Sequence, residues 1–177
     1  MSPLGRNTIS LKIINTIKLK CKHEIIILLK YSKAKQDTWI LNVLTNAITQ
    51  GPSLNIGRHS HGCERLNDES ILVAGGYDFG VLASTEILKV GEHEWINGPD
   101  LKEGVWANEL VKSNSKEYVA YNLGGNLNDI LYHPSPKIYG LNRDMNEWQL
   151  IEMMNEPHFT LYGSALNVPI NKIAWCK

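Results

Sequence analysis

The sequence repeats itself with a period near fifty residues, and this repeat limits the fold more than any other feature. Gly51-Pro52 recurs as Gly98-Pro99, 47 residues later, and the same offset places residues 38–41 on residues 85–88. A single glycine–proline pair recurs by chance, whereas several coincidences in one order do not. A repeat of this length predicts similar structural units that bury their apolar faces against one another.

The repeat continues downstream with small insertions. Gly75-Gly76 recurs as Gly124-Gly125 at an offset of 49, and Trp95 recurs as Trp148 at an offset of 53. A drifting offset is typical of loops that change length between copies. We therefore expect each unit to keep its strands and to vary in its loops.

Each unit is predicted to consist of strands. Residues 70–74 form a short apolar run stopped by glycines, as in a strand covered on both faces. Residues 85–90 carry Glu86 and Lys89, which favour a half-covered strand. Trp95 begins a short strand that Gly98-Pro99 ends, because proline cannot donate to a sheet ladder. With a first strand over residues 60–66, each unit has four strands, and the chain is predicted to be all-β with four-stranded antiparallel units.

An apolar run ending in Gly-Gly, then a loop, a Glu-bearing strand, a spaced tryptophan and Gly-Pro-x-Leu resembles the Kelch repeat. Residues 71–101 match best, and Arg58, His61 and Cys63 resemble the lead-in strand of that family. The next copy departs from the pattern, since Lys137 stands where the family usually has glutamate. The resemblance implies a β-propeller whose blades each have four strands.

The resemblance also implies boundaries for the units. We expect about three and a half repeats, arranged as a part-blade over 37–54, blades over 55–101 and 102–154, and an incomplete blade over 155–177. Within the last segment, residues 159–166 resemble a new lead-in strand and residues 171–176 resemble residues 69–74. Residues 1–36 form a divergent N-terminal segment, with degenerate blade strands as one interpretation. So few units predict a partial propeller that associates through its open edges or with missing blades, or a fragment of a longer protein.

Composition excludes several classes of function. Lys plus Arg (18) equals Asp plus Glu (18), so no net charge attracts nucleic acid or an anionic membrane. The three cysteines are widely spaced, which favours a reducing compartment. Lysines interrupt the apolar residues near the N-terminus, unlike the centre of a signal peptide. These features predict a cytoplasmic protein.

The segment RHSHGC contains the best candidate metal ligands in the sequence. His59, His61 and Cys63 alternate, so in a strand they would share one face and could bind zinc or copper. No second cluster of matching spacing completes a four-ligand site, and the family has a core strand here. We therefore predict no metal and no cofactor.

The loops that follow the double glycines are the predicted binding sites. Residues 77–84 (YDFGVLAS) and 126–135 (NLNDILYHPS) join strands at equivalent places, and loops of this kind lie on one face of family propellers and bind peptides. Aromatic residues dominate the energetic centres of interfaces. We predict six partner-binding residues: Tyr77, Asp78, Phe79, Asn126, Asp129 and Tyr132.

The resemblance implies a protein–protein interaction scaffold rather than an enzyme. Many members of the family are substrate receptors of cullin ubiquitin ligases, and others associate with actin, so the expected partner is a protein. The alternatives are a Kelch-type enzyme, similar to galactose oxidase or to sialic-acid epimerases, and a truncated fragment without function. No carboxylate pair and no nucleophile with a base stands out in the sequence, which disfavours the enzyme.

Overall fold

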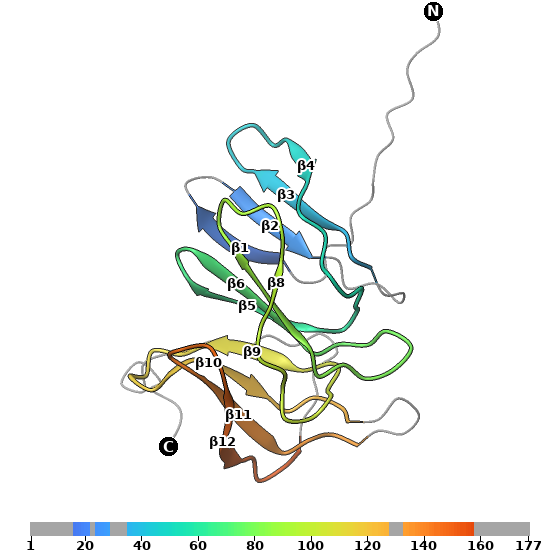
Figure 1. The fold of residues 1–177 in the computed structure, drawn as a ribbon, viewed down its shortest axis with the longest axis vertical. Helices are drawn as coiled ribbons and strands as arrows, with labels where there is room; N and C mark the ends of the chain where they lie inside the picture. The colour runs from blue at the N-terminus through green and yellow to red at the C-terminus, as the bar shows by residue number, and fades with distance from the viewer. Residues whose placement is uncertain (1–15, 22–23, 29–34, 128–132, 158–177) are drawn as a thin grey trace, which may run out of the picture.

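A computed structural model describes residues 16–21, 24–28, 35–127 and 133–157, which form three four-stranded antiparallel sheets (Figure 1). The first sheet contains β1 (Thr16–Cys21), β2 (Glu24–Leu28), β3 (Thr38–Asn42) and β4 (Ile48–Gln50). The second contains β5 (Gly62–Asn67), β6 (Ser70–Ala74), β7 (Thr85–Lys89) and β8 (Ile96–Asn97). The third contains β9 (Glu109–Lys112), β10 (Tyr118–Leu123), β11 (Lys137–Asn142) and β12 (Trp148–Met153). The prediction of an all-β chain with four-stranded antiparallel units is confirmed for these residues.

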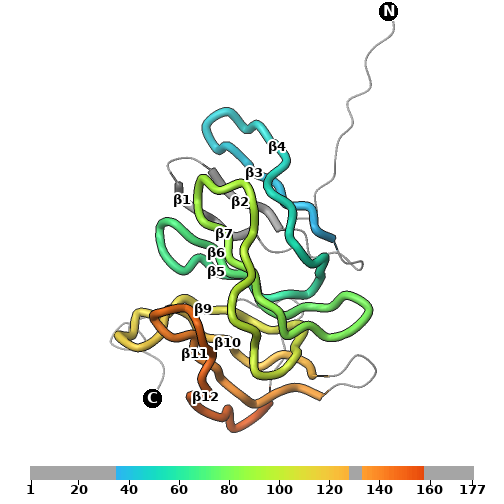
Figure 2. The backbone as a smooth tube through the Cα atoms, in the orientation of Figure 1, coloured from blue at the N-terminus to red at the C-terminus, as the bar shows by residue number. Residues whose placement is uncertain are grey.

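The three sheets follow one another in space in the order of the sequence (Figures 1 and 2). Each sheet is ordered as consecutive neighbouring strands, and the first strand of the second sheet, β5, contacts both β1 and β9. The first strands of the three sheets therefore lie together, while β4, β8 and β12 lie at the opposite edges. The described sheets do not close into a ring.

The second sheet is buried on both faces because it lies between the other two. Alternate residues of β6 point to opposite faces. Ile71 and Val73 pack with Trp95 and Leu54, in a cluster that also touches Ile40 of the first sheet. Leu72 and Ala74 instead join the larger cluster shared with the third sheet. The continuous apolar run over residues 70–74 is thus a doubly covered strand, as predicted.

Equivalent hydrogen bonds confirm the 47-residue offset between the first two sheets. The hydroxyl of Thr38 donates to the carbonyl oxygen of Pro52 at 2.7 Å, and the hydroxyl of Thr85 donates to that of Pro99 at 2.9 Å. In both sheets the amide of the glycine before the proline donates to the backbone of the same threonine. The Gly-Pro pair is therefore tied to the start of the third strand of its own sheet.

The two tryptophans of the repeat join neighbouring sheets. The indole N–H of Trp95 donates to the carbonyl oxygen of Pro52 at 2.9 Å, and that of Trp148 donates to Pro99 at 3.1 Å. Each indole thus reaches back to the Gly-Pro turn of the preceding sheet. Both rings are buried, so they also fill space between neighbouring units.

The double glycine after β6 is required by backbone conformation and by crowding. Gly75 and Gly76 have φ of +67° and +101°, in the left-handed region that glycine adopts without steric cost. A Cβ atom on Gly75 would collide with the carbonyl oxygen of Val105, at the entrance to the third sheet. The amide of Gly76 donates to that same oxygen at 2.7 Å. The second and third sheets therefore approach each other closely at the double glycine.

Replacement of Gly75 by alanine should therefore destabilise the protein by at least about 2 kcal/mol, since the left-handed conformation and the collision both add to the cost. Gly80 is the matched control, because a Cβ built on it meets nothing within 4 Å. Gly80→Ala should change the free energy of unfolding by less than about 0.5 kcal/mol. Urea unfolding followed by circular dichroism measures both, and equal effects of the two substitutions would contradict this account of the double glycine.

Two predictions about the strands after the loops were wrong. Strand β7 is not half-covered: residues Thr85 to Leu88 are buried and Glu86 is 0% exposed, because Arg58 supplies a buried counter-ion. The residue that takes the place of Glu86 in the third sheet is Tyr139 and not Lys137. Pairing shows this, since Val73 faces Glu86 while the equivalent Asn122 faces Tyr139.

Residues 159–166 and 171–176, which resemble the strands of a further unit, lie outside the described residues. Within the described part of the chain there is no helix that is long and apolar enough to span a membrane.

Candidate interaction surface

The loops after the two double glycines occupy the same place in their sheets. His59 pairs with Tyr77 in an isolated antiparallel bridge, and Trp106 pairs in the same way with Asn126. Tyr77 then pairs with Val81, as Asn126 pairs with Pro134. The loop of the second sheet projects at this end of the sheets, to the right in Figures 1 and 2.

The loop of the second sheet is a tight turn with a phenylalanine at its tip. The amide of Asp78 donates to the carbonyl oxygen of Gly80 at 3.0 Å, and the amide of Leu82 donates to Gly76 at 2.9 Å. Phe79 has φ of +53°, which is uncommon for a residue with a bulky side chain. Phe79 is 101% exposed, so its side chain buries almost no surface against the rest of the chain.

Arg58 holds both ends of this loop. Its Nη1 atom donates to the carbonyl oxygen of Gly75 at 2.7 Å and to that of Ser84 at 2.9 Å. Its Nη2 atom donates to the Ser84 hydroxyl at 3.1 Å and to Oε1 of Glu86 at 2.7 Å. Gly75 and Ser84 flank the loop, so one guanidinium fixes the distance between the two points where the loop leaves the sheet.

Glu86 connects the same site to the segment that enters the second sheet. Its two carboxylate oxygens accept the backbone amides of Asn55 at 2.6 Å and Ile56 at 3.1 Å. Burial lowers the pKa of Arg58, and the hydrogen bond to Glu86 opposes that shift. Both charged side chains are completely buried, so each depends on the other for its main electrostatic compensation.

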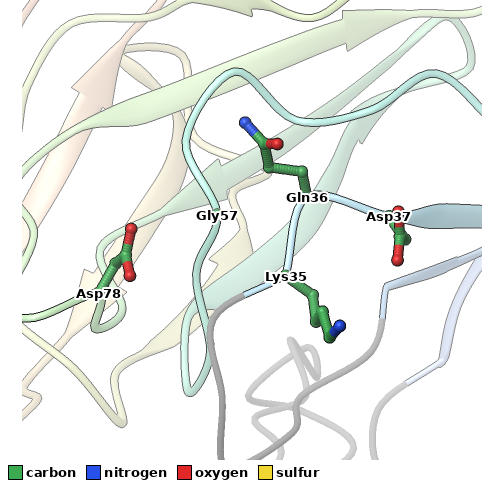
Figure 3. A pocket seen from close by; sticks show the side chains of 5 residues that line it. All are labelled: Lys35, Gln36, Asp37, Gly57 and Asp78. Atoms are coloured by element: carbon green, nitrogen blue, oxygen red, sulfur yellow. The ribbon is translucent and has the colours of Figure 1, made fainter.

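An open polar hollow lies beside the loop (Figure 3). Its volume is about 470 Å³, and it is lined by Lys35, Gln36, Asp37, Gly57 and Asp78. Asp78 lies across the hollow from residues 35–37, which lead into β3 of the first sheet. The hollow therefore lies between the loop of the second sheet and the segment before β3 of the first sheet.

His59 supports the base of the loop. Its ring lies 5.4 Å from the ring of Tyr77, and its Nδ1 atom is 3.0 Å from the Ser60 hydroxyl. Partial burial lowers the pKa of His59, against an opposing influence of Asp78. Tyr77 is half-buried by this contact, so it presents only part of its surface to a partner.

The loop of the third sheet offers fewer described contacts. Asn126 is only 1% exposed, and its side-chain oxygen accepts the amide of His133 at 2.6 Å. A buried amide with this hydrogen bond shapes the loop from within, so we do not place Asn126 among the residues that face a partner. Asp129 and Tyr132, the other two predicted contacts in this loop, lie outside the described residues.

A half-exposed ion pair closes the third-sheet loop in place of the buried pair. Glu103 accepts hydrogen bonds from the ammonium group of Lys137 at 2.6 Å and from the hydroxyl of Ser135 at 2.8 Å. The hydrogen bond to Glu103 raises the pKa of Lys137. At the positions equivalent to Arg58 and Glu86 the third sheet has Val105 and Tyr139, both buried.

The residues of RHSHGC do not line up on one strand face. Strand β5 begins at Gly62, and Ser60 has φ of +51°, which interrupts the alternation between His59 and His61. Among the residues that the structure describes, no group of three His, Cys, Asp or Glu side chains is placed to hold a metal ion.

The sequence pointed to Arg58 only as a feature of the lead-in strand, and it gave Glu86 no functional role. The pair lies 28 positions apart in sequence, and neither spacing nor periodicity indicates that these side chains meet. The available signal was Glu86 inside a predicted strand, because a buried charge needs a partner.

No protein-family model matches this sequence, and no curated protein is significantly similar to it. The class of protein is therefore assigned from the structure alone. The described residues form an all-β protein of stacked four-stranded antiparallel sheets with an exposed loop at one end.

Proposed function

We propose that this chain is an arc of a Kelch-type propeller and acts as a protein-interaction module, with the loop over residues 77–84 as its contact element. The repeated Gly-Gly, Trp and Gly-Pro positions, and the meeting of β1, β5 and β9, support the propeller arrangement. No arrangement of side chains in the described residues favours an enzyme over this function.

The observation that carries the proposal is the exposure of Phe79. A phenylalanine that is 101% exposed buries no surface in the chain that bears it, so its apolar ring gains from contact with something else. The loop is short and both of its ends are fixed, so binding would require little ordering of the loop. The polar hollow beside Asp78 offers room for a polar part of the partner next to the ring.

A phage-displayed library of random 12-residue peptides, selected on the purified protein, tests the proposal. Affinities of the selected peptides are then measured by fluorescence anisotropy. Phe79→Ala should weaken binding by about tenfold or more, as for an aromatic residue at the centre of an interface.

Leu44→Ala is the matched control, because Leu44 is also a well exposed apolar residue but lies in the turn between β3 and β4. It should leave the affinities unchanged. If the selected peptides bind Phe79→Ala as tightly as the wild type, this loop is not the contact element.

A further inference from the structure

The second sheet differs from the third at one pair of buried positions. Strand pairing makes Glu86 equivalent to Tyr139, and the bridges of His59 and Trp106 make Arg58 equivalent to Val105. One sheet thus holds a buried ion pair where its neighbour holds two uncharged side chains. The first sheet has Trp39 at the position of Glu86, so it has no carboxylate there.

The uncharged residues of the third sheet show that this architecture does not require the charges. Val105 and Tyr139 are 1% and 6% exposed, so the same positions are filled well by an apolar and an aromatic side chain. Apolar replacement of a buried ion pair is often neutral or stabilising, because removing two charges from water is costly. The charged pair in the second sheet is therefore explained poorly by stability alone.

What distinguishes the charged pair is its set of backbone partners. Arg58 donates to the carbonyl oxygens of Gly75 and Ser84, at the two ends of the loop that carries Phe79. Valine has no donor for either oxygen. In the third sheet, Glu103 instead accepts hydrogen bonds from the Ser135 hydroxyl and the Lys137 ammonium group at the end of the loop.

We infer that Arg58, oriented by Glu86, is a positioning residue that fixes the conformation in which the loop presents Phe79. Arginine suits this role because its planar fork offers several donors in fixed directions, and its charge persists at every accessible pH. This inference rests on the proposed function, because fixing the conformation of the loop affects function only if the loop binds a partner. The mobility of the loop is measurable without any partner.

The test is the double substitution Arg58→Val with Glu86→Tyr, which copies the third sheet into the second. Native-state hydrogen exchange reports on the amides of Asp78 and Leu82 within the loop, and on Leu72 and Ile87 within the sheet. The loop amides should exchange about tenfold faster or more in the double variant, while the sheet amides keep their wild-type protection. Glu103→Gln is the control, because it disturbs the other loop and should leave Asp78 and Leu82 unchanged.

Two outcomes would overturn the inference: unchanged exchange of the loop amides in a folded double variant, or a uniform rise over loop and sheet together, which indicates global destabilisation only. If the double variant does not fold, Arg58→Lys serves instead, because lysine keeps the charge but cannot reproduce the fork. It should raise exchange selectively in the loop, and unchanged exchange would again overturn the inference. Loss of peptide binding in Phe79→Ala with no change in loop exchange in these variants would leave the proposed function standing and reject this inference alone.

Discussion

Glu86→Leu should destabilise the protein by about 3–5 kcal/mol, the cost expected when one partner of a buried ion pair is removed. The substitution leaves the Arg58 guanidinium charged and completely buried without its ion-pair partner, because a guanidinium keeps its proton at every accessible pH. It also removes the acceptor of the amides of Asn55 and Ile56. Unmade hydrogen bonds of buried groups add to the electrostatic cost.

Chemical unfolding of Glu86→Leu and of the exposed control Glu92→Leu measures this effect. The control should differ from the wild type by less than about 0.5 kcal/mol. The loss in Glu86→Leu should be nearly the same at low and at high salt, since a buried pair is screened little. A loss below about 1 kcal/mol, or one that salt abolishes, would mean that water reaches Arg58. Addition of Arg58→Val to a Glu86→Tyr background should recover much of the stability, as strongly coupled positions are not additive.

The regular parts of this fold could be predicted from the sequence because they obey short-range rules. The strand over residues 70–74 was found with its exact bounds, since an apolar run between a turn and two glycines leaves few alternatives. The 47-residue offset also holds in the strand pairing, since Trp39 pairs with Gln50 in the first sheet as Glu86 pairs with Asn97 in the second. At these residues, local strand propensity and tertiary packing favour the same structure.

The errors arose where the answer depends on residues that are distant in sequence. Glu86 appeared to be a surface residue, because a carboxylate in a strand usually faces water and its counter-ion lies in another segment. Lys137 was placed at the position of Glu86 on the resemblance of the sequence alone. Only the hydrogen-bonded register shows that the strand is shifted by two residues from that alignment.

The loops were located correctly as segments, but not their individual side chains. Phe79 and Asn126 looked alike as candidates, yet one is fully exposed and the other is buried. Loops have no periodicity from which to read a buried face, and the left-handed conformation that turns Phe79 outward has no signal in a phenylalanine. The strands could therefore be predicted from the sequence, whereas the exposed side chains of the loops could not.

Trp148→Ala should destabilise the protein by about 3–5 kcal/mol, as for deletion of a large buried aromatic side chain. Its ring is 0% exposed and packs with Leu101 and Val105 in the core shared by the second and third sheets. The indole N–H also donates to the carbonyl oxygen of Pro99, which belongs to the second sheet. The substitution therefore removes packing and a hydrogen bond from the same junction.

Trp148→Phe separates these two contributions. The carbonyl oxygen of Pro99 keeps the hydroxyl of Thr85 as a donor, so it is not left without a hydrogen bond when the indole is lost. Phenylalanine retains most of the apolar contact, and the loss should be roughly 1–2 kcal/mol. Unfolding is followed by far-ultraviolet circular dichroism, because the substitution removes a fluorophore. Phe79→Ala serves as the control for loss of an exposed aromatic and should change stability by less than about 0.5 kcal/mol. If Trp148→Ala were no more harmful than Phe79→Ala, the second and third sheets would not be held together through this ring, and the stacked arrangement itself would be in error.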